Sequence, residues 1–393
     1  MPIPLSQLQN TKREHVEELS RQLGTADCRA GVLFLPFSSL SGEELDRLAP
    51  SPIAAQVSMD RFLRRLWSEL RCYLEETRNL KIPRIAVDGI VSRMRKFEVI
   101  ILGDGPAGHV IASLGSLQFL WAMNHWSILA DRDPSLTMPL TQERELLQER
   151  IYRTMIQLAY WFYSGTPTPP QWDYWCAGVE ERQEIDFRTR IQVALMLLHE
   201  TAHVALGHSE EVSRGWDEEL AKEYPLLGAV GHAIALEYKA DLHGLELLLS
   251  YVQERYGSTE KAESAYRAIY GFFVMLALIE EICAGRRPGR GDIVTFKLRS
   301  SHPTMDERRK SVATYLESRV SKSVLQCLSD AENVVRHWLA TFDIVSGNLA
   351  RAHMQLVIGS FAPMVLPPGV AGWGGFINPY QDDTCQFEDI YQP

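Results

Sequence analysis

A short apolar run that contains two histidines four positions apart constrains this chain more than any other feature. The run Val193–Gly207 has no proline and no glycine before Gly207, so we expect it to be helical. Positions four apart lie on one face of a helix, so His199 and His203 can direct two imidazoles at one ion. Glu200 lies about 100° around the helix from His199, where it can reach a water on that ion without being a ligand. The alternative is a buried amphipathic helix whose histidines hydrogen-bond locally.

Two histidines alone do not complete a catalytic zinc site, because such an ion usually has three protein ligands and one open position for water. The best third ligand is Glu237, which lies 34 residues after His203 in a second long predicted helix. If that helix folds back antiparallel onto the first, its carboxylate can reach the ion. Asp241 follows one turn later on the same face and can accept the second N–H of a ligand histidine. The alternative for both acidic residues is an exposed charged face. Three other histidines, His208, His232 and His243, are disfavoured by their helical positions.

The order of these motifs resembles the gluzincin metallopeptidases. His199-Glu200-x-x-His203 followed by Glu237-x-x-Ala-Asp241 is similar to the HtpX and CAAX-prenyl-protease class, whose signature is Glu-x-x-Ala-Asp. The resemblance implies one zinc ion per chain, held by the two histidines and Glu237, with Glu200 as the general base of peptide hydrolysis.

A third segment, Ser301–Arg308, resembles the His-Pro segment of that class, with an arginine six residues after the histidine. The resemblance implies that His302 and Arg308 stabilise the oxyanion. Tyr238 is a weaker alternative for that role. The structural alternative is a histidine at a helix start and a surface arginine.

The chain departs from that class in having no evident membrane span. Its most apolar run, Ile269–Ile279, is too short to cross a bilayer, and its first residues lack the apolar core of a signal peptide. The six cysteines are widely spread, which is typical of reduced thiols in the cytosol. A formal net charge of -10 argues against nucleic acid or an anionic membrane as a partner. We therefore expect a cytoplasmic protein, and a soluble gluzincin of this kind resembles the Lit phage-exclusion peptidase group.

A glycine-rich segment, Gly103–Gly108, supports a competing hypothesis. It reads as a strand, then G-x-G-x-x-G, then a helix, and so resembles the dinucleotide fingerprint of flavoproteins. Asp131 could stand at the end of a second strand. No alternating strand–helix series follows, and a plain strand-to-helix turn would use the same glycines for positive φ. The alternative function is a nucleotide- or flavin-binding sensor module.

The predicted fold is mostly α (α+β), with a zincin-like helical metallopeptidase core, a small sheet and an N-terminal extension. We expect an N-terminal α+β region at 1–185, a gluzincin catalytic core at 186–320 and a C-terminal helix and tail at 321–393. Helices are predicted near residues 8–23, 57–77, 140–164, 227–256, 259–282, 303–316 and 321–350, and a strand at 31–36.

The predicted function is a zinc-dependent endopeptidase that acts on a cytosolic protein, in phage defence or stress response. An unrestrained cytosolic protease is harmful, so we expect a lid, an activating partner or a ligand to gate it. A third hypothesis, an inactive scaffold stabilised by zinc, is disfavoured because a structural site does not require Glu200.

Overall fold

The computed structural model of the protein describes residues between 52 and 333, with gaps. The described ranges are 52–90, 97–101, 107–131, 179–208, 228–257, 260–284, 303–322, 324–326, 328–330 and 332–333, together with Ile151, Met155 and Leu158. The predictions for residues 8–23, 31–36 and the C-terminal tail lie outside them.

The described part is mostly helical with a small sheet, which confirms the predicted mostly-α class. Its elements are α3 (Pro52–Cys72), the π-helical turn η2 (Tyr73–Thr77), β1 (Arg84–Ile90), β2 (Phe97–Ile101), β3 (Ala107–Ser113), α4 (Leu114–Asp131), α6 (Val179–Ala205), α9 (Gly228–Tyr256), α10 (Glu260–Ala284) and α12 (Met305–Glu317).

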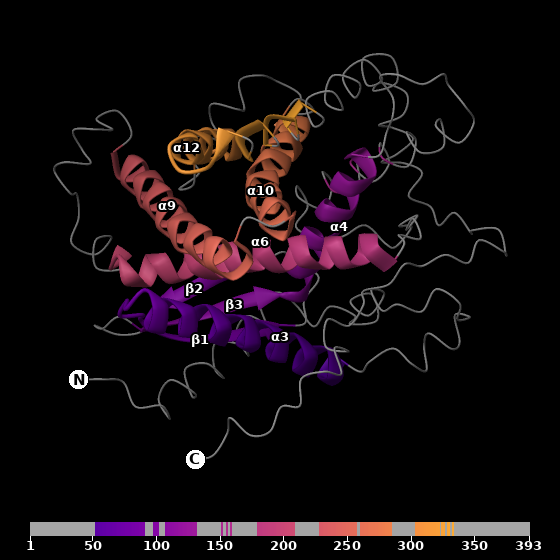
Figure 1. Cartoon of the computed structure of the whole chain (residues 1–393). Coiled ribbons are helices and arrows are strands. Elements are labelled where there is room, and N and C mark those ends of the chain that lie inside the picture. Colours follow the sequence, from indigo (N-terminus) through magenta and orange to yellow (C-terminus); the bar gives the residue numbers. More distant parts are fainter. Residues whose placement is uncertain are drawn as a thin grey trace, which may run out of the picture.

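The sheet lies between α3 and α6 (Figure 1). Its strand order is β1-β3-β2, with β1 parallel to β3 and β2 antiparallel to it. Every residue of β3 is buried. At Gly108 an added Cβ would lie 2.8 Å from a methyl group of Val204 on α6. The glycine therefore lets the sheet pack closely against the histidine-bearing end of α6.

The expected helix after Gly108 is wrong. Gly108 lies inside strand β3, which runs antiparallel to β2, and helix α4 begins only at Leu114. The apolar residues that follow the glycines form a central strand covered on both faces, and periodicity alone does not separate such a strand from a buried helix. The nucleotide hypothesis thus loses the helix N-terminus that was to face a pyrophosphate. Asp131 is the last residue of α4 rather than the end of a strand.

Helix α6 is the centre of the helical layer, with α4, α9 and α10 packed against it (Figure 1). One hydrophobic core contains residues of α3, the sheet, α4, α6, α9, α10 and α12. The boundary expected between residues 185 and 186 falls inside α6. The helix spans it because its first half packs in the same core as its second half.

Three of the predicted helices are confirmed, and those predicted at 140–164 and 321–350 lie mostly outside the described residues. The helices predicted at 227–256 and 259–282 are confirmed as α9 and α10, and 57–77 as α3 with η2. Strand β1 was not predicted. Pro303 was expected at the first helical position, but α12 begins at Met305 and Thr304 is its N-cap.

One helical stretch, Glu260–Glu280 of α10, is long and apolar enough to cross a membrane by length and composition. Of its most apolar window, 72% is buried inside the protein. A core helix of a soluble protein passes the same test, and the stretch by itself decides nothing about a membrane.

Candidate metal centre

The two histidines of α6 converge at the C-terminal end of the helix. The Nε2 atoms of His199 and His203 lie 3.2 Å apart, and their ring centroids are 4.8 Å apart. The apolar run before them is buried, with Val193, Leu197 and Leu198 fully inaccessible. That burial fixes the rotation of α6 and leaves both imidazoles directed at one point.

Glu237 reaches the same point from α9. One carboxylate oxygen lies 3.6 Å from His199 Nε2 and the other lies 3.6 Å from His203 Nε2. The predicted antiparallel packing of the two helices is confirmed by their contacts. Glu237 lies beside His203, whereas Tyr256, at the far end of α9, packs against Phe187 near the start of α6.

Gly244 lets α9 approach α6 closely beside the histidines. An added Cβ would lie 2.9 Å from the backbone nitrogen of His199 and 3.1 Å from its Cα. Contacts this short with backbone atoms require one of the helices to move. The absence of a side chain at this position therefore sets the distance over which Glu237 reaches the histidines.

We expect Gly244→Ala to lower both stability and metal affinity. Overpacking typically costs about 1–3 kcal/mol, and a shift of α9 would carry Glu237 away from the histidines. Gly271 on α10 is the matched control, because nothing lies within 4 Å of a Cβ added there. Gly271→Ala should stabilise the helix by about 0.5–1 kcal/mol. Thermal unfolding of both variants, with and without metal, checks this, and equal behaviour of the two would contradict it.

His199, His203 and Glu237 together could hold a metal ion. One potential ligand atom from each lies within 4.8 Å of the others, and their side chains are only 12–15% exposed. Two imidazole nitrogens and one carboxylate oxygen are a ligand set typical of catalytic zinc. The group is the same three residues that the sequence predicted.

Asp241 stands behind His199. Its Oδ1 atom lies 3.0 Å from His199 Nδ1, off the direction of an N–H bond, so the contact is an ion pair rather than a well-aligned hydrogen bond. Arg308 of α12 donates to both carboxylate oxygens, from Nε at 2.7 Å and from Nη2. Burial raises the pKa of Asp241, but Arg308 and His199 outweigh burial and lower it. Asp241 therefore stays ionised behind the histidine.

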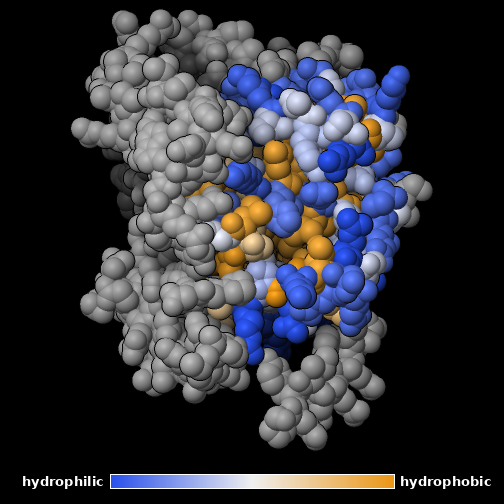
Figure 2. Space-filling view, turned by 90° about the vertical axis from the view of Figure 1, so that its left-hand side faces the viewer, coloured by the Kyte–Doolittle hydropathy of each residue, from blue (hydrophilic) through white to orange (hydrophobic). Residues whose placement is uncertain are grey.

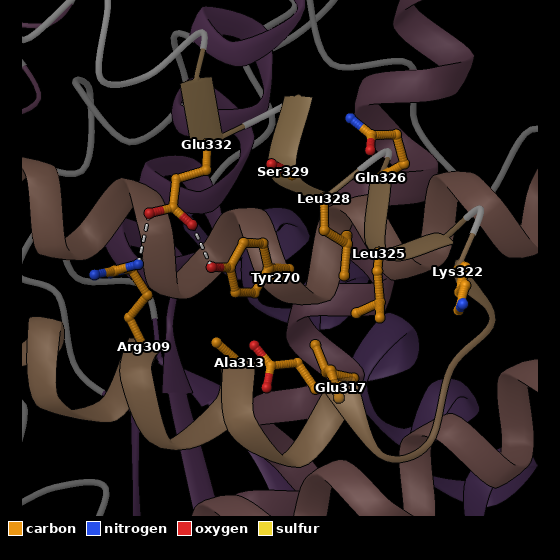
Figure 3. A pocket seen from close by; sticks show the side chains of 11 residues that line it. Tyr270, Arg309, Ala313, Glu317, Lys322, Leu325, Gln326, Leu328, Ser329 and Glu332 are labelled. Atoms are coloured by element: carbon orange, nitrogen blue, oxygen red, sulfur yellow. Dashed lines mark hydrogen bonds and ion pairs between the residues drawn. The ribbon is translucent and has the colours of Figure 1, made fainter.

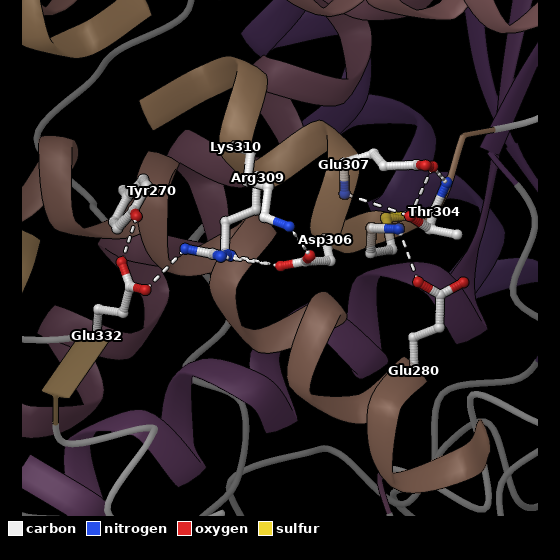
Figure 4. A network of polar contacts seen from close by, with 9 residues as sticks. Tyr270, Glu280, Thr304, Asp306, Glu307, Arg309, Lys310 and Glu332 are labelled. Carbon is white, nitrogen blue, oxygen red and sulfur yellow. Dashed lines mark hydrogen bonds and ion pairs between the residues drawn. The ribbon is translucent and has the colours of Figure 1, made fainter. Parts of the chain in front are cut away.

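Helix α12 holds Arg308 in place through contacts at its first turns. Thr304 and Glu307 form a capping box, and the backbone N–H of Met305 donates to Glu280 of α10 at 2.7 Å. Figure 4 shows these contacts and a second set around Arg309, which binds Asp306 and Glu332. The arginine next to Arg308 thus anchors the helix while Arg308 reaches Asp241.

Glu200 is half-buried on α6, beside the three candidate ligands His199, His203 and Glu237, which we call the metal group. Burial raises its pKa, the charge of Glu237 adds to this, and the value reaches about 7 despite His199 and Arg308. The backbone of Val99 in β2 hydrogen-bonds to Glu200. A carboxylate with a pKa near neutrality is suited to accept and return a proton at physiological pH.

The two ligand histidines differ in their protonation. Burial lowers the pKa of His199, but the neighbouring Asp241 and Glu237 outweigh burial and raise it to about 10. Burial and the charge of His199 lower the pKa of His203 to about 4. At neutral pH without metal, a proton on His199 therefore lies between the two imidazoles and Glu237.

His208 is a residue of the site that sequence reasoning set aside. It was disfavoured as a ligand because it lies five positions after His203, and it is indeed not in the metal group. Instead its Nδ1 atom lies 2.8 Å from Nδ1 of His203, and the side chain is 3% exposed. The presence of three histidines at 199, 203 and 208 was the only sequence signal for it.

Two of the remaining predicted residues cannot be placed relative to the group, and two others lie on α9 outside it. His302 and the side chain of His232 lie outside the described residues. Tyr238 and His243 are half-buried on α9 and are not among the candidate metal ligands. Arg308 meets Asp241 with two nitrogens, which is the arrangement of a supporting residue, and its oxyanion role stays a prediction.

The described part of the protein has two further features, a hydrophobic area on its surface and a cavity. Figure 2 shows hydrophobic residues gathered on one face and framed by hydrophilic ones. A cavity of about 510 Å³ lies between α10, α12 and residues 322–332 (Figure 3). Its lining includes Tyr270, Arg309 and Glu332 but no residue of the metal group, so it is separate from the candidate centre.

Comparisons of the chain with protein-family models, with curated proteins and with solved structures found no match.

Proposed function

We propose that the protein is a zinc-dependent endopeptidase of the gluzincin type. The observation that carries the proposal is the convergence of His199, His203 and Glu237 from two antiparallel helices, with Glu200 beside them. The order of the motifs in the chain, and their similarity to the HtpX and CAAX-prenyl-protease class, support the same assignment.

His199, His203 and Glu237 would hold one zinc ion. When bound, zinc acts as a Lewis acid and lowers the pKa of a water molecule toward 7. Asp241, fixed by Arg308, orients His199 through its Nδ1 atom. We propose that Arg308 acts through this carboxylate.

Glu200 is the general base in this proposal. Its carboxylate takes a proton as water adds to the scissile carbonyl carbon, and then donates that proton to the leaving amine nitrogen as the C–N bond breaks. The raised pKa of Glu200 favours both transfers near neutral pH. His302 stays a candidate for stabilising the oxyanion.

The position of β2 supports a peptide as the substrate. Within the described residues β2 pairs with β3 alone, so it is one of the two edge strands of the described sheet. Its Val99 lies against Glu200. An extended peptide can add to such an edge through main-chain hydrogen bonds, which would bring a peptide bond close to Glu200.

We further propose that the substrate is a cytosolic protein and that access to the centre is gated. The three metal-group side chains are no more than 15% exposed, so a polypeptide needs part of the chain to move before it can enter. Stress response and phage defence are the settings that the sequence resemblance favours.

The test of the proposed function combines metal content with peptide hydrolysis. The full-length protein should bind one zinc ion and cleave short quenched-fluorescent peptides, which bypass a gate more readily than a folded protein. Chelation should stop cleavage and zinc should restore it. Zinc binding without cleavage of any peptide in a random library would contradict the peptidase proposal while leaving the metal centre intact.

His199 is expected to lose its extra proton when zinc binds. Its pKa of about 10 means that it is protonated at pH 7, and a metal ligand has to give up that proton. The apparent zinc affinity should therefore rise with pH, by up to about tenfold per unit for one proton, until the pH reaches that pKa. Calorimetry in buffers of different ionisation enthalpy measures the released protons. Binding at pH 7 with no proton release would contradict the assignment.

A further inference from the structure

We propose that His208 is a positioning residue that holds the proton of His203 on Nδ1 and so keeps Nε2 of His203 available to the metal. The inference rests on the proposed metal centre and adds a residue that the ligand pattern does not include. It is carried by the geometry of the two rings and by the backbone turn between them.

The turn after α6 explains how His208 reaches His203. On a continued helix, a residue five positions later would lie about 140° around the axis. Instead α6 ends at Ala205, and Gly207 adopts a φ of +70°. The N–H of Gly207 donates to the carbonyl oxygen of Val204 at 3.2 Å, closing the last turn. A left-handed residue after a helix reverses the chain, and here the reversal folds His208 back beneath His203.

The two rings meet through their Nδ1 atoms. The Nδ1–Nδ1 distance is 2.8 Å, with ring centroids 4.9 Å apart and ring planes at 75°. A hydrogen bond of this length between two nitrogens requires one proton, carried by one of them. His203 Nε2 faces His199 and Glu237, so the two nitrogens of His203 have separate tasks.

A metal bound at Nε2 of His203 requires the shared proton to lie on Nδ1 of the same ring, and in our proposal His208 holds it there before the metal binds. A ligand nitrogen must be unprotonated, so a neutral His203 that binds through Nε2 carries its proton on Nδ1. His208 Nδ1 is then the acceptor, and its own proton is on Nε2. In the opposite arrangement the shared proton would lie on His208 Nδ1, and Nε2 of His208 would be an acceptor. That Nε2 atom is buried, and no described residue donates a hydrogen bond to it, so no described contact favours the opposite arrangement.

The two ligand histidines are thus supported by different chemistry. His199 is backed by the carboxylate of Asp241, whereas His203 is backed by a neutral imidazole. Partners of this kind fix the tautomer and ring orientation of ligand histidines, and their loss typically costs about 10–100-fold in metal affinity. We assign His208 an effect of that size.

Two substitutions separate the acceptor from the bulk of the side chain. Asparagine can place an amide oxygen near the position of Nδ1, so His208→Asn keeps an acceptor, whereas His208→Ala removes it. We expect His208→Ala to weaken zinc by about 10–100-fold and His208→Asn by no more than about threefold. The control is His125→Asn on α4, since His125 is as buried as His208 but stands against Trp121. It should lower stability without changing zinc affinity.

Zinc dissociation constants are measured on the full-length protein by competition with a chromogenic chelator. Unchanged affinity in His208→Ala, or equal losses in the alanine and asparagine variants, would overturn the proposal. Wild-type protein that binds no zinc would overturn it together with the metal centre. Wild-type protein that binds zinc but cleaves nothing would overturn only the peptidase function.

A second measurement stays decisive if His208→Ala does not fold. In metal-free protein labelled with ¹⁵N in histidine, the ring nitrogens of His203 report directly which one carries the proton. We expect the proton on Nδ1 in the wild type and in His208→Asn. A proton on Nε2 of His203 in the wild type would overturn the proposal, whatever the zinc affinities are.

Discussion

Glu200→Gln is expected to abolish peptide hydrolysis while zinc stays bound. Glutamine keeps the size of the side chain and its contact with β2, but it cannot take a proton from water near neutral pH. General acid–base catalysis contributes about 10²–10⁴-fold, and Glu200 serves both proton transfers, so the loss should be at least about a thousandfold. Zinc stoichiometry by mass spectrometry under native conditions, beside a peptide cleavage assay, measures both quantities.

The matched control for this variant is Glu184→Gln. Glu184 lies on the same helix, where it accepts hydrogen bonds from Arg188 and Ser264, far from the metal group. It should lower stability modestly and leave the turnover of folded enzyme unchanged. Persistent turnover in Glu200→Gln would remove Glu200 as the general base, and an equal loss in both variants would indicate damage to the fold.

Glu237→Ala is expected to lower zinc affinity more than any substitution behind the ligands. It removes one of three ligands, whereas loss of an outer partner alone costs about 10–100-fold, so the loss should exceed about a hundredfold. It also takes away one of the two carboxylates that hold the proton on His199, so the pKa of His199 should fall. Chelator competition measures the zinc affinity, and histidine NMR measures the pKa.

Glu246→Ala is the control for that variant. Glu246 is on the same helix, is half-exposed and pairs with Arg319 at 3.7 Å on the surface. An exposed ion pair contributes little, so zinc affinity and stability should both be nearly unchanged. If Glu237→Ala bound zinc as tightly as Glu246→Ala, the third ligand would lie elsewhere in the chain and the two-helix site would be wrong.

The two variants together separate an enzyme from a zinc-stabilised scaffold. In an enzyme, Glu200→Gln loses turnover and keeps zinc, whereas Glu237→Ala loses both. In a scaffold, zinc would raise the unfolding temperature in the wild type and in Glu200→Gln alike, and no peptide would be cleaved by either. Catalysis and metal-dependent stability should therefore be measured on the same preparations.

The glycine-rich segment shows where sequence reasoning failed and why. Residues 95–113 were expected to form a strand, a turn and a helix, but the described part forms two antiparallel strands, β2 and β3. A strand–turn–helix unit and a pair of antiparallel strands both place glycines between two apolar stretches. Because β3 is buried on both faces, Val110, Ile111 and Ala112 are all apolar, so the alternation that would mark a strand is absent there.

The residues that contact the candidate ligands from behind show a second limit of prediction from the sequence. Asp241 was predicted behind a ligand because it lies one helical turn after Glu237, and it does lie beside His199. Arg308 was predicted from a motif as a residue that stabilises the oxyanion, and only the packing of α12 against α9 brings its guanidinium to Asp241. His208 was set aside because five positions along a helix would turn it away from His203. That spacing applies only while the helix continues, and α6 ends at Ala205.

The sequence by itself determined the spacing within each helix, which places His199 beside His203, and Glu237 one turn before Asp241. These relations are local, since 3.6 residues per turn fix them wherever the helix forms. Only the tertiary structure decided how α9 lies on α6 and α12 on α9, that the chain turns back at Gly207, and that the middle of β2 lies beside Glu200. Those relations depend on the packing of distant apolar surfaces and on one left-handed residue, and neither has a fixed period in the chain.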